Sequence, residues 1–104
     1  MSVLVSVSDY IEGYQIVQHK DIVIGIGNSI ADGYMYREAA IRKASELAES
    51  IGANAVTSIH IDVHHTGEVF EAAAIGNAVV VKSLHNDTSD NVDLNDTAEE
   101  TEEE

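Results

Sequence analysis

The sequence predicts one small α+β domain in which a single helix packs on a mainly antiparallel sheet. Three patterns support this fold class: alternating apolar residues in the first part of the chain, an apolar stripe at helical spacing in the middle, and renewed alternation afterwards. The expected strands cover residues 3–8, 14–19, 22–27, 55–63 and 69–81. If residues 14–27 form one bent strand, the element order is β-β-α-β-β.

The first strands follow from a period of two residues. Valine recurs at every second position over residues 3–7, and isoleucine does so over residues 22–26, which is the pattern of a strand with one buried face. Residues 9–13 between these runs have the composition of a turn. Lys20 and Asp21 then form either a tight turn or a kink within one long strand.

The helix is the clearest element. Its apolar stripe comprises Ala40, Ile41, Ala44, Leu47, Ala48 and Ile51. The pattern predicts a helix over about residues 30–51, with Ser29 and Asp32 as a variant of the N-terminal capping box. Gly33 weakens the first turn, and Gly52 supplies a left-handed C-terminal cap.

The last expected strand is apolar on both faces. Residues 72–75 and 79–81 leave no polar side over much of its length. A sheet that carries a helix on one side normally has a polar second face. We therefore expect another subunit to cover the second face of this strand, and a homo-oligomer several times the chain mass of 11.2 kDa.

Charge and length divide the chain into a single domain, residues 1–84, and an acidic tail, residues 85–104. A chain of 104 residues has room for one domain. Nine of the 19 acidic residues lie from Asp87 onward, where apolar residues are scarce, so we expect the tail to be disordered. Because the chain has no cysteine, oligomerisation rather than disulfide bonding is the expected source of extra stability for so small a core.

The net charge of −14 limits the classes of partner. Five Lys and Arg residues, spread along the chain, are too few for a phosphate-binding surface, so we expect no nucleic-acid and no membrane partner. No apolar run is long enough to span a bilayer and no secretory signal is present, which predicts a cytoplasmic location. The excess of acid also fits a cytoplasm of high salt concentration.

Three segments together resemble the YbjQ-like family, which is often labelled heavy-metal-binding. They are Glu12–Val17, Gly52–Val56 after the helix, and Ile59–Asp62 leading to Gly76–Val81. The match covers about residues 3–82. The resemblance implies a two-layer subunit of the dodecin-subunit-like type that assembles into a ring, expected to be a homopentamer. Members of that family usually carry a longer segment before the helix, with Gly and Arg, which residues 27–33 replace here.

His60, Asp62 and His64 form the sharpest constellation of metal-ligating residue types. Positions i, i+2 and i+4 of a strand share one face, at roughly 6.5–7 Å per step. Two histidines and a carboxylate are typical ligands of zinc, nickel or copper, with a position left for water or for a ligand from another subunit. His65 points to the other face. The alternative is that these are polar residues on a solvated or intersubunit sheet face.

Other motifs carry weaker indications. Gly25 and Gly27 before a helix start suggest a phosphate loop, but Ile30 stands where the dinucleotide fingerprint needs glycine and no Gly-Lys pair follows; a tight turn also explains the glycines. Neither cysteine nor a Gly-x-Ser-x-Gly elbow is present, so no catalytic residue is expected. The tyrosines are candidates for stacking on a ligand or for anchoring a core or an interface: Tyr10, Tyr14, Tyr34 and Tyr36.

These observations leave three classes of function open. The first is a non-enzymatic, homo-oligomeric protein that binds a divalent transition metal such as zinc, or a small ligand, where copies of His60, Asp62 and His64 meet. The second is a purely structural or partner-binding ring assembly in which these histidines have no metal role. A small hydrolytic or acid/base enzyme comes third, since a His-Asp pair on one strand face can act as acid and base.

Overall fold

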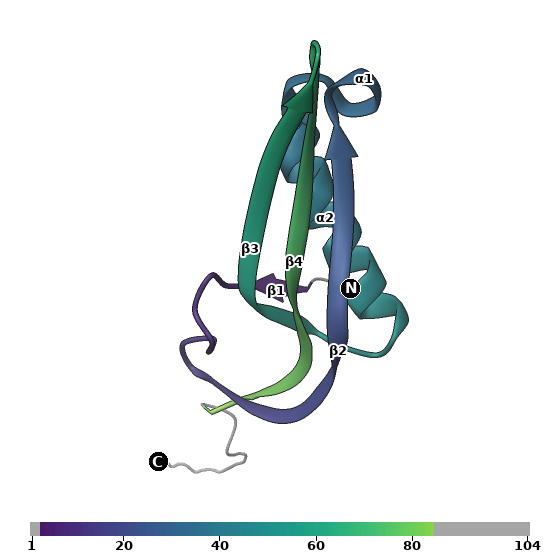
Figure 1. Cartoon of the computed structure of the whole chain (residues 1–104). Coiled ribbons are helices and arrows are strands. Elements are labelled where there is room, and N and C mark those ends of the chain that lie inside the picture. The colour runs from purple at the N-terminus through teal and green to yellow at the C-terminus, as the bar shows by residue number, and fades with distance from the viewer. Residues whose placement is uncertain (1–2, 85–104) are drawn as a thin grey trace, which may run out of the picture.

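The computed structural model describes residues 3–84. The elements are the strands β1 (Leu4–Val5) and β2 (Tyr14–Asn28), the short helix α1 (Ser29–Asp32), the 3-10 turn η1 (Gly33–Met35), the helix α2 (Tyr36–Ser50), and the strands β3 (Ala55–Thr66) and β4 (Val69–Ser83). Figure 1 shows the three long strands side by side with α2 along one face. The expected α+β class is confirmed, and the predicted acidic tail lies outside the described residues.

Within residues 3–84 the four strands form one mixed sheet in the order β1-β3-β4-β2. β4 is antiparallel to both β2 and β3, whereas β1 is parallel to β3. β1 covers only part of the expected strand over residues 3–8. The chain nevertheless stays beside β3, because the Ser6 amide donates to the Val56 carbonyl at 3.0 Å and the Ser58 amide donates to the Ser8 carbonyl at 2.8 Å. Ser58 has a φ of 54° at a bulge in β3.

β2 is one long strand, which confirms the interpretation of Lys20 and Asp21 as a kink rather than a turn. Its pairing with β4 shifts register twice, between Ile16 and Gln18 and between His19 and Asp21. Each shift leaves an extra residue on β2, and such bulges bend a strand and increase its twist. The bend is visible where β2 curves at the bottom of Figure 1.

The expectation of one unbroken helix from about residue 30 is wrong at its start. Asn28, rather than Ser29, is the cap: its Oδ1 accepts from the amides of Ile30 at 3.1 Å and Ala31 at 2.9 Å. Asp32 Oδ2 accepts in turn from the Asn28 amide at 3.0 Å. Gly33 then has a φ of 59°, which interrupts helical geometry, so that the long helix begins only at residue 36.

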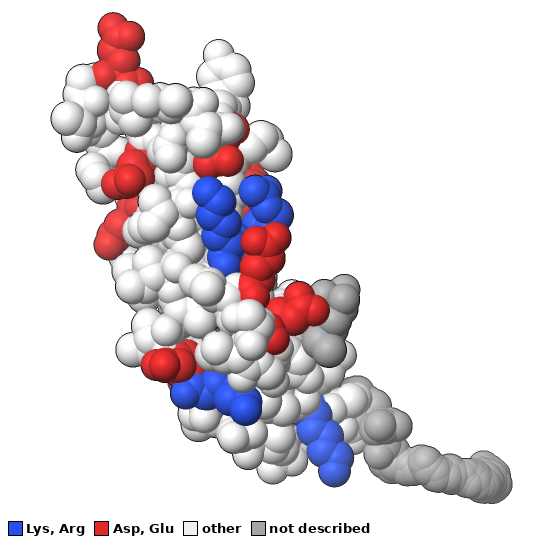
Figure 2. All heavy atoms as spheres, turned by 90° about the vertical axis from the view of Figure 1, so that its right-hand side faces the viewer, with Lys and Arg blue, Asp and Glu red and all other residues white. Residues whose placement is uncertain are grey.

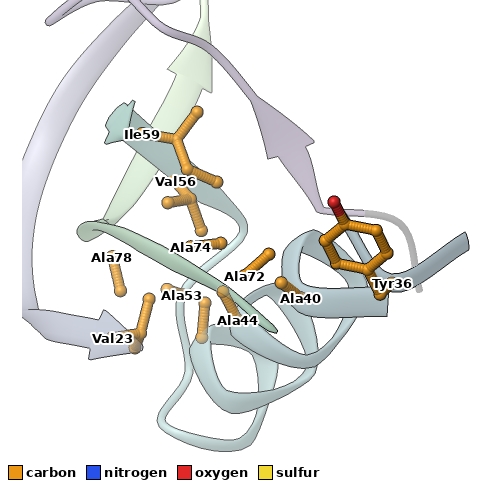
Figure 3. Close-up of a cluster of buried hydrophobic side chains, with 11 residues drawn as sticks. Val23, Tyr36, Ala40, Ala44, Ala53, Val56, Ile59, Ala72, Ala74 and Ala78 are labelled. Carbon is orange, nitrogen blue, oxygen red and sulfur yellow. The ribbon is translucent and has the colours of Figure 1, made fainter. Parts of the chain in front are cut away.

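The helix α2 lies very close to the sheet. Gly25 and Gly27 are inside β2 and face α2; a Cβ at Gly25 would collide with the backbone oxygen of Ala40, and one at Gly27 with that of Tyr36. The tight-turn explanation for these glycines is therefore wrong, because they permit close contact between helix and strand. Figure 3 shows the resulting core, in which small side chains of the helix and the sheet meet. Its buried residues are Val23, Tyr36, Ala40, Ala44, Ala48, Ala53, Val56, Ile59, Ala72, Ala74 and Ala78.

The segment Gly52–Val56, which carries much of the family resemblance, has a structural role. Gly52 has a φ of 90° and ends the helix as expected. The Asn54 side chain then pairs with the backbone of Val81 twice: Nδ2 donates to the carbonyl at 3.0 Å and Oδ1 accepts from the amide at 2.8 Å. Asn54 thus takes the place of a strand neighbour for β4, so this motif encodes the fold rather than a binding site.

Candidate functional site

The sheet has two faces of different character. One face packs on α2, and we call the other, helix-free face the open face. Residues on β2 alternate, so the buried Val23, Gly25 and Gly27 face α2, while the intervening isoleucines lie on the open face. Their exposed fractions are 62% for Ile22, 50% for Ile24 and 41% for Ile26.

The chain itself covers one end of the open face. Around the short strand β1, the buried residues Ala55, Val79 and Val81 pack against Leu4, Ile11 and Ile16. The expectation that another subunit covers the whole second face of the last strand is therefore wrong at this end. Beyond it, Ile75 pairs with Ile24 and Ala73 pairs with Ile26, and no described segment covers these apolar residues.

His60, Asp62 and His64 lie on the open face, directly beside this apolar area. The register of β3 places His60 opposite Ile75 and Asp62 opposite Ala73 on β4. The predicted sharing of one strand face by the three side chains is confirmed. His60 Nε2 lies 2.9 Å from Asp62 Oδ1, and the two side chains are 70% and 65% exposed. β3 thus presents a nitrogen and an oxygen that could both ligate a metal, next to each other on one face of the strand.

His64 does not join that pair. Its Nε2 lies 3.0 Å from Oε1 of Glu71, its cross-strand neighbour on β4, while His65 contacts the Phe70 ring at 5.3 Å between centroids. No group of three or more metal-ligating residues converges anywhere in residues 3–84. Sequence reasoning missed Glu71, although a tight turn at Gly67 and Glu68 implies that it pairs with His64.

His60, Asp62 and His64 form what we call the open-face row, and two hollows lie away from it. The larger, of about 530 Å³, is at the end of the molecule where η1 and the β3–β4 turn meet, and it is lined by Tyr34, Tyr36 and Phe70 among others. The smaller, of about 420 Å³, lies between β2 and α2. There Lys43 Nζ donates to the Ile26 carbonyl at 2.9 Å, so it satisfies one backbone group on the outer edge of β2.

The start of α1 does not form a phosphate loop. The amides of Ile30 and Ala31, which an anion would need, both donate to the Asn28 side chain. On the face seen in Figure 2, basic side chains lie next to acidic ones and form no wide basic surface. Arg42 Nε lies 3.9 Å from Glu46 Oε2, and Lys43 Nζ lies 3.8 Å from Asp32 Oδ2. No helix within residues 3–84 is long and apolar enough to cross a membrane.

The chain is similar to proteins of one family. No family model matches it. A UPF0145 protein of Methanocaldococcus jannaschii is 31% identical over 91 residues, which cover 78% of this chain and 94% of that protein. A UPF0145 protein of Listeria monocytogenes serotype 4a is 33% identical over 106 residues, which cover 77% of this chain and 96% of that protein. A crystal structure from Pediococcus pentosaceus, described as a DUF74-family protein of unknown function, aligns with a TM-score of 0.58 at 13% identity over 77% of this chain and 98% of that one.

The fold is a small α+β domain with one long helix packed on a mixed sheet, and the Pediococcus structure supports that fold alone. The chain belongs to the UPF0145 family, the YbjQ-like family that its sequence resembles. The alignment with the Listeria protein spans 106 positions but only 77% of the 104 residues here. That relative therefore has residues without a counterpart in this chain.

Proposed function

We propose that this protein is a non-enzymatic subunit of a homo-oligomer that assembles through the open face of its sheet. The observation that carries the proposal is the group of isoleucines left at the surface, with Ile22 the most exposed at 62%. Removing apolar surface from water contributes roughly 25 cal/mol for each Å², and the entropic cost of association offsets part of this gain. Contiguous exposed apolar area in a small protein is typical of an interface.

A closed ring, which the family resemblance leads us to expect as a homopentamer, requires two different surfaces. The open face of one copy must contact another surface of the next copy, since a contact between identical surfaces produces a two-fold dimer instead. The end of α2 offers such a surface, because Leu47, which lines the smaller hollow beside β2, and Ile51, the C-cap of the helix, are 47% and 42% exposed. We propose that these helix residues meet the open-face isoleucines of the neighbouring subunit.

Native mass measurement with light scattering tests the assembly. We expect the wild type to have several times the chain mass of 11.2 kDa, and Ile24→Asp to become monomeric while keeping its secondary structure by circular dichroism. Ile30→Asp is the matched control, because Ile30 is 78% exposed but lies on α1. A monodisperse wild-type monomer at physiological salt would contradict the proposal.

A second candidate function is the binding of a divalent transition metal, such as zinc, through the open-face row. The observation that favours it is the 2.9 Å separation between His60 Nε2 and Asp62 Oδ1. One chain supplies only part of such a metal site. No three ligating residues converge within residues 3–84, whereas tetrahedral zinc sites with an open position need three protein ligands. We propose that a neighbouring subunit supplies the remaining donors, so the metal site depends on the assembly.

Thermal unfolding with added metal tests this second function. Zinc or nickel added to chelator-treated protein should raise the melting temperature, because a ligand that binds only the folded state stabilises it. His60→Ala combined with His64→Ala should abolish the rise, whereas His19→Ala on β2 should keep it. If no first-row metal raises the melting temperature, the row belongs to a purely structural or partner-binding assembly instead.

A further inference from the structure

The larger hollow is built from segments distant in sequence and held together by specific contacts. The Ser29 hydroxyl oxygen accepts from the Phe70 amide at 2.9 Å, which ties the start of the helical segment to β4. The Tyr36 and Phe70 rings pack with centroids 6.0 Å apart. Tyr34 stands at the rim and is 98% exposed. The hollow of about 530 Å³ is within the usual range for small-ligand sites, roughly 300–1,000 Å³.

Three polar groups at this hollow have no polar partner in the described chain. Tyr36 is only 8% exposed, yet within residues 3–84 its hydroxyl makes no hydrogen bond, and its side chain is engaged only through ring contacts. Tyr36 lines the hollow, and its hydroxyl can donate one hydrogen bond and accept others. Arg37 and Glu68 also line the hollow, and neither forms an ion pair with any described residue.

Arg37 is exposed and contacts the neighbouring Tyr36 ring. Its guanidinium carbon lies 5.0 Å from the centroid of the Tyr36 ring, which is within the range of a cation–π contact. A guanidinium held in this way remains free to bind a carboxylate with two parallel hydrogen bonds. Glu68, in the turn between β3 and β4, supplies the opposite charge at the same hollow.

We propose that this hollow binds a small zwitterion with an aromatic ring, of the aromatic amino-acid class. The ligand ring packs against Tyr34 and Phe70, its carboxylate pairs with Arg37, and its ammonium pairs with Glu68. The presence of Glu68 disfavours a phosphate-bearing ligand, which would meet a like charge there, as does the net charge of −14. This site is separate from the open face and does not rest on the proposed assembly.

Because the protein contains no tryptophan, the fluorescence anisotropy of added L-tryptophan reports its binding directly. We expect anisotropy to rise to saturation, with tryptamine, which lacks the carboxylate, and indole-3-propionate, which lacks the ammonium, binding about tenfold more weakly each, the cost of losing one charge-assisted contact. No rise at millimolar ligand, or equal affinity for all three compounds, overturns the proposal.

Two variants assign the charges. Arg37→Gln should weaken L-tryptophan binding about tenfold and leave tryptamine unchanged, while Glu68→Gln should weaken L-tryptophan similarly and leave indole-3-propionate unchanged. Arg42→Gln is the matched control, since Arg42 is on the same helix but does not line the hollow. The Ile24→Asp variant should keep full affinity, which separates this site from the open face. If Phe70→Leu changes the oligomer mass and not ligand affinity, another subunit occupies the hollow and the proposal fails.

Discussion

The two faces of the sheet distribute large and small side chains in opposite ways. Against α2 stand glycine and alanine, with Ala72 and Ala74 at 0% exposure, whereas the open face displays isoleucines that are 41% to 62% exposed. Burial alone would place the larger apolar side chains inside. The close approach of α2 excludes them there. The proposed assembly would bury the large side chains of the open face, and each prediction below tests the contrast between the two faces.

The largest effect is expected where the helix touches the strand backbone. Gly27→Ala places a Cβ against the backbone oxygen of Tyr36, and a backbone atom cannot rotate away as a side chain can. We expect the free energy of unfolding to fall by about 3 kcal/mol or more, measured by chemical denaturation. Ile26→Val, at the neighbouring position on the open face, is the control and should cost under about 1 kcal/mol. Equal losses for both variants would remove the distinction between the faces.

A matched pair of alanines sharpens the comparison within one strand. Ala74 is fully buried beneath α2, while its neighbour Ala73 lies on the open face beside Ile26. Ala74→Leu should lower the unfolding free energy by about 2 kcal/mol, because the core has no room for the added atoms. Ala73→Leu should leave thermal stability of the monomeric Ile24→Asp background nearly unchanged. A larger loss for Ala73→Leu than for Ala74→Leu would show that the open face is the more tightly packed one.

Two asparagines extend the comparison to polar side chains, because Asn54 is hydrogen-bonded to the backbone of β4 while Asn77 is exposed on the open face. Asn54→Ala leaves the amide and the carbonyl of Val81 without their partner, and such half-buried orphan groups cost about 1.5 kcal/mol in unfolding free energy. Asn77→Ala, on the open face of β4 where Asn77 is exposed, should cost less than about 0.5 kcal/mol. Thermal melts of the two variants measure the difference, and indistinguishable melting temperatures would argue against a strand-like role for Asn54.

Local periodicity made the strands and their faces predictable. Alternation in β2 and β3 depends only on neighbouring residues, and it correctly separated Ile59 and Ile61 from His60 and Asp62. The start of the helix was harder to predict. It depends on which polar residue forms the cap, and Asn28 does so. The positive φ of Gly33 then interrupts the helix before α2 begins. Side-chain oxygens of similar capping ability at adjacent positions cannot be ranked by pattern alone.

Features that depend on distant pairing were missed. The bulge at Ser58 lies where the register between β3 and β4 shifts, and the Ser58 amide donates to the distant Ser8 carbonyl. The cover over Val79 comes from Leu4 and Ile11, also far away in sequence. Of the candidate sites, the open-face row was predictable because its residues share one strand. The hollow was not, since Arg37 and Glu68 come to line the same hollow only after the sheet has formed, although Tyr34 and Tyr36 were recognised as candidates for stacking on a ligand.

The smallest effect on stability is expected for the open-face row, at the pair of His64 with Glu71. His64 and Glu71 lie 3.0 Å apart, but their side chains are 63% and 41% exposed, and exposed pairs of this kind gain little because water screens them. A double-mutant cycle with His64→Ala and Glu71→Ala should give a coupling energy below about 0.5 kcal/mol in the metal-free protein. Residues that contribute so little to stability are free to serve another purpose, and with zinc present the coupling should rise if both side chains belong to a metal site. A coupling above about 1 kcal/mol without metal would instead assign the pair to holding the β3–β4 hairpin together.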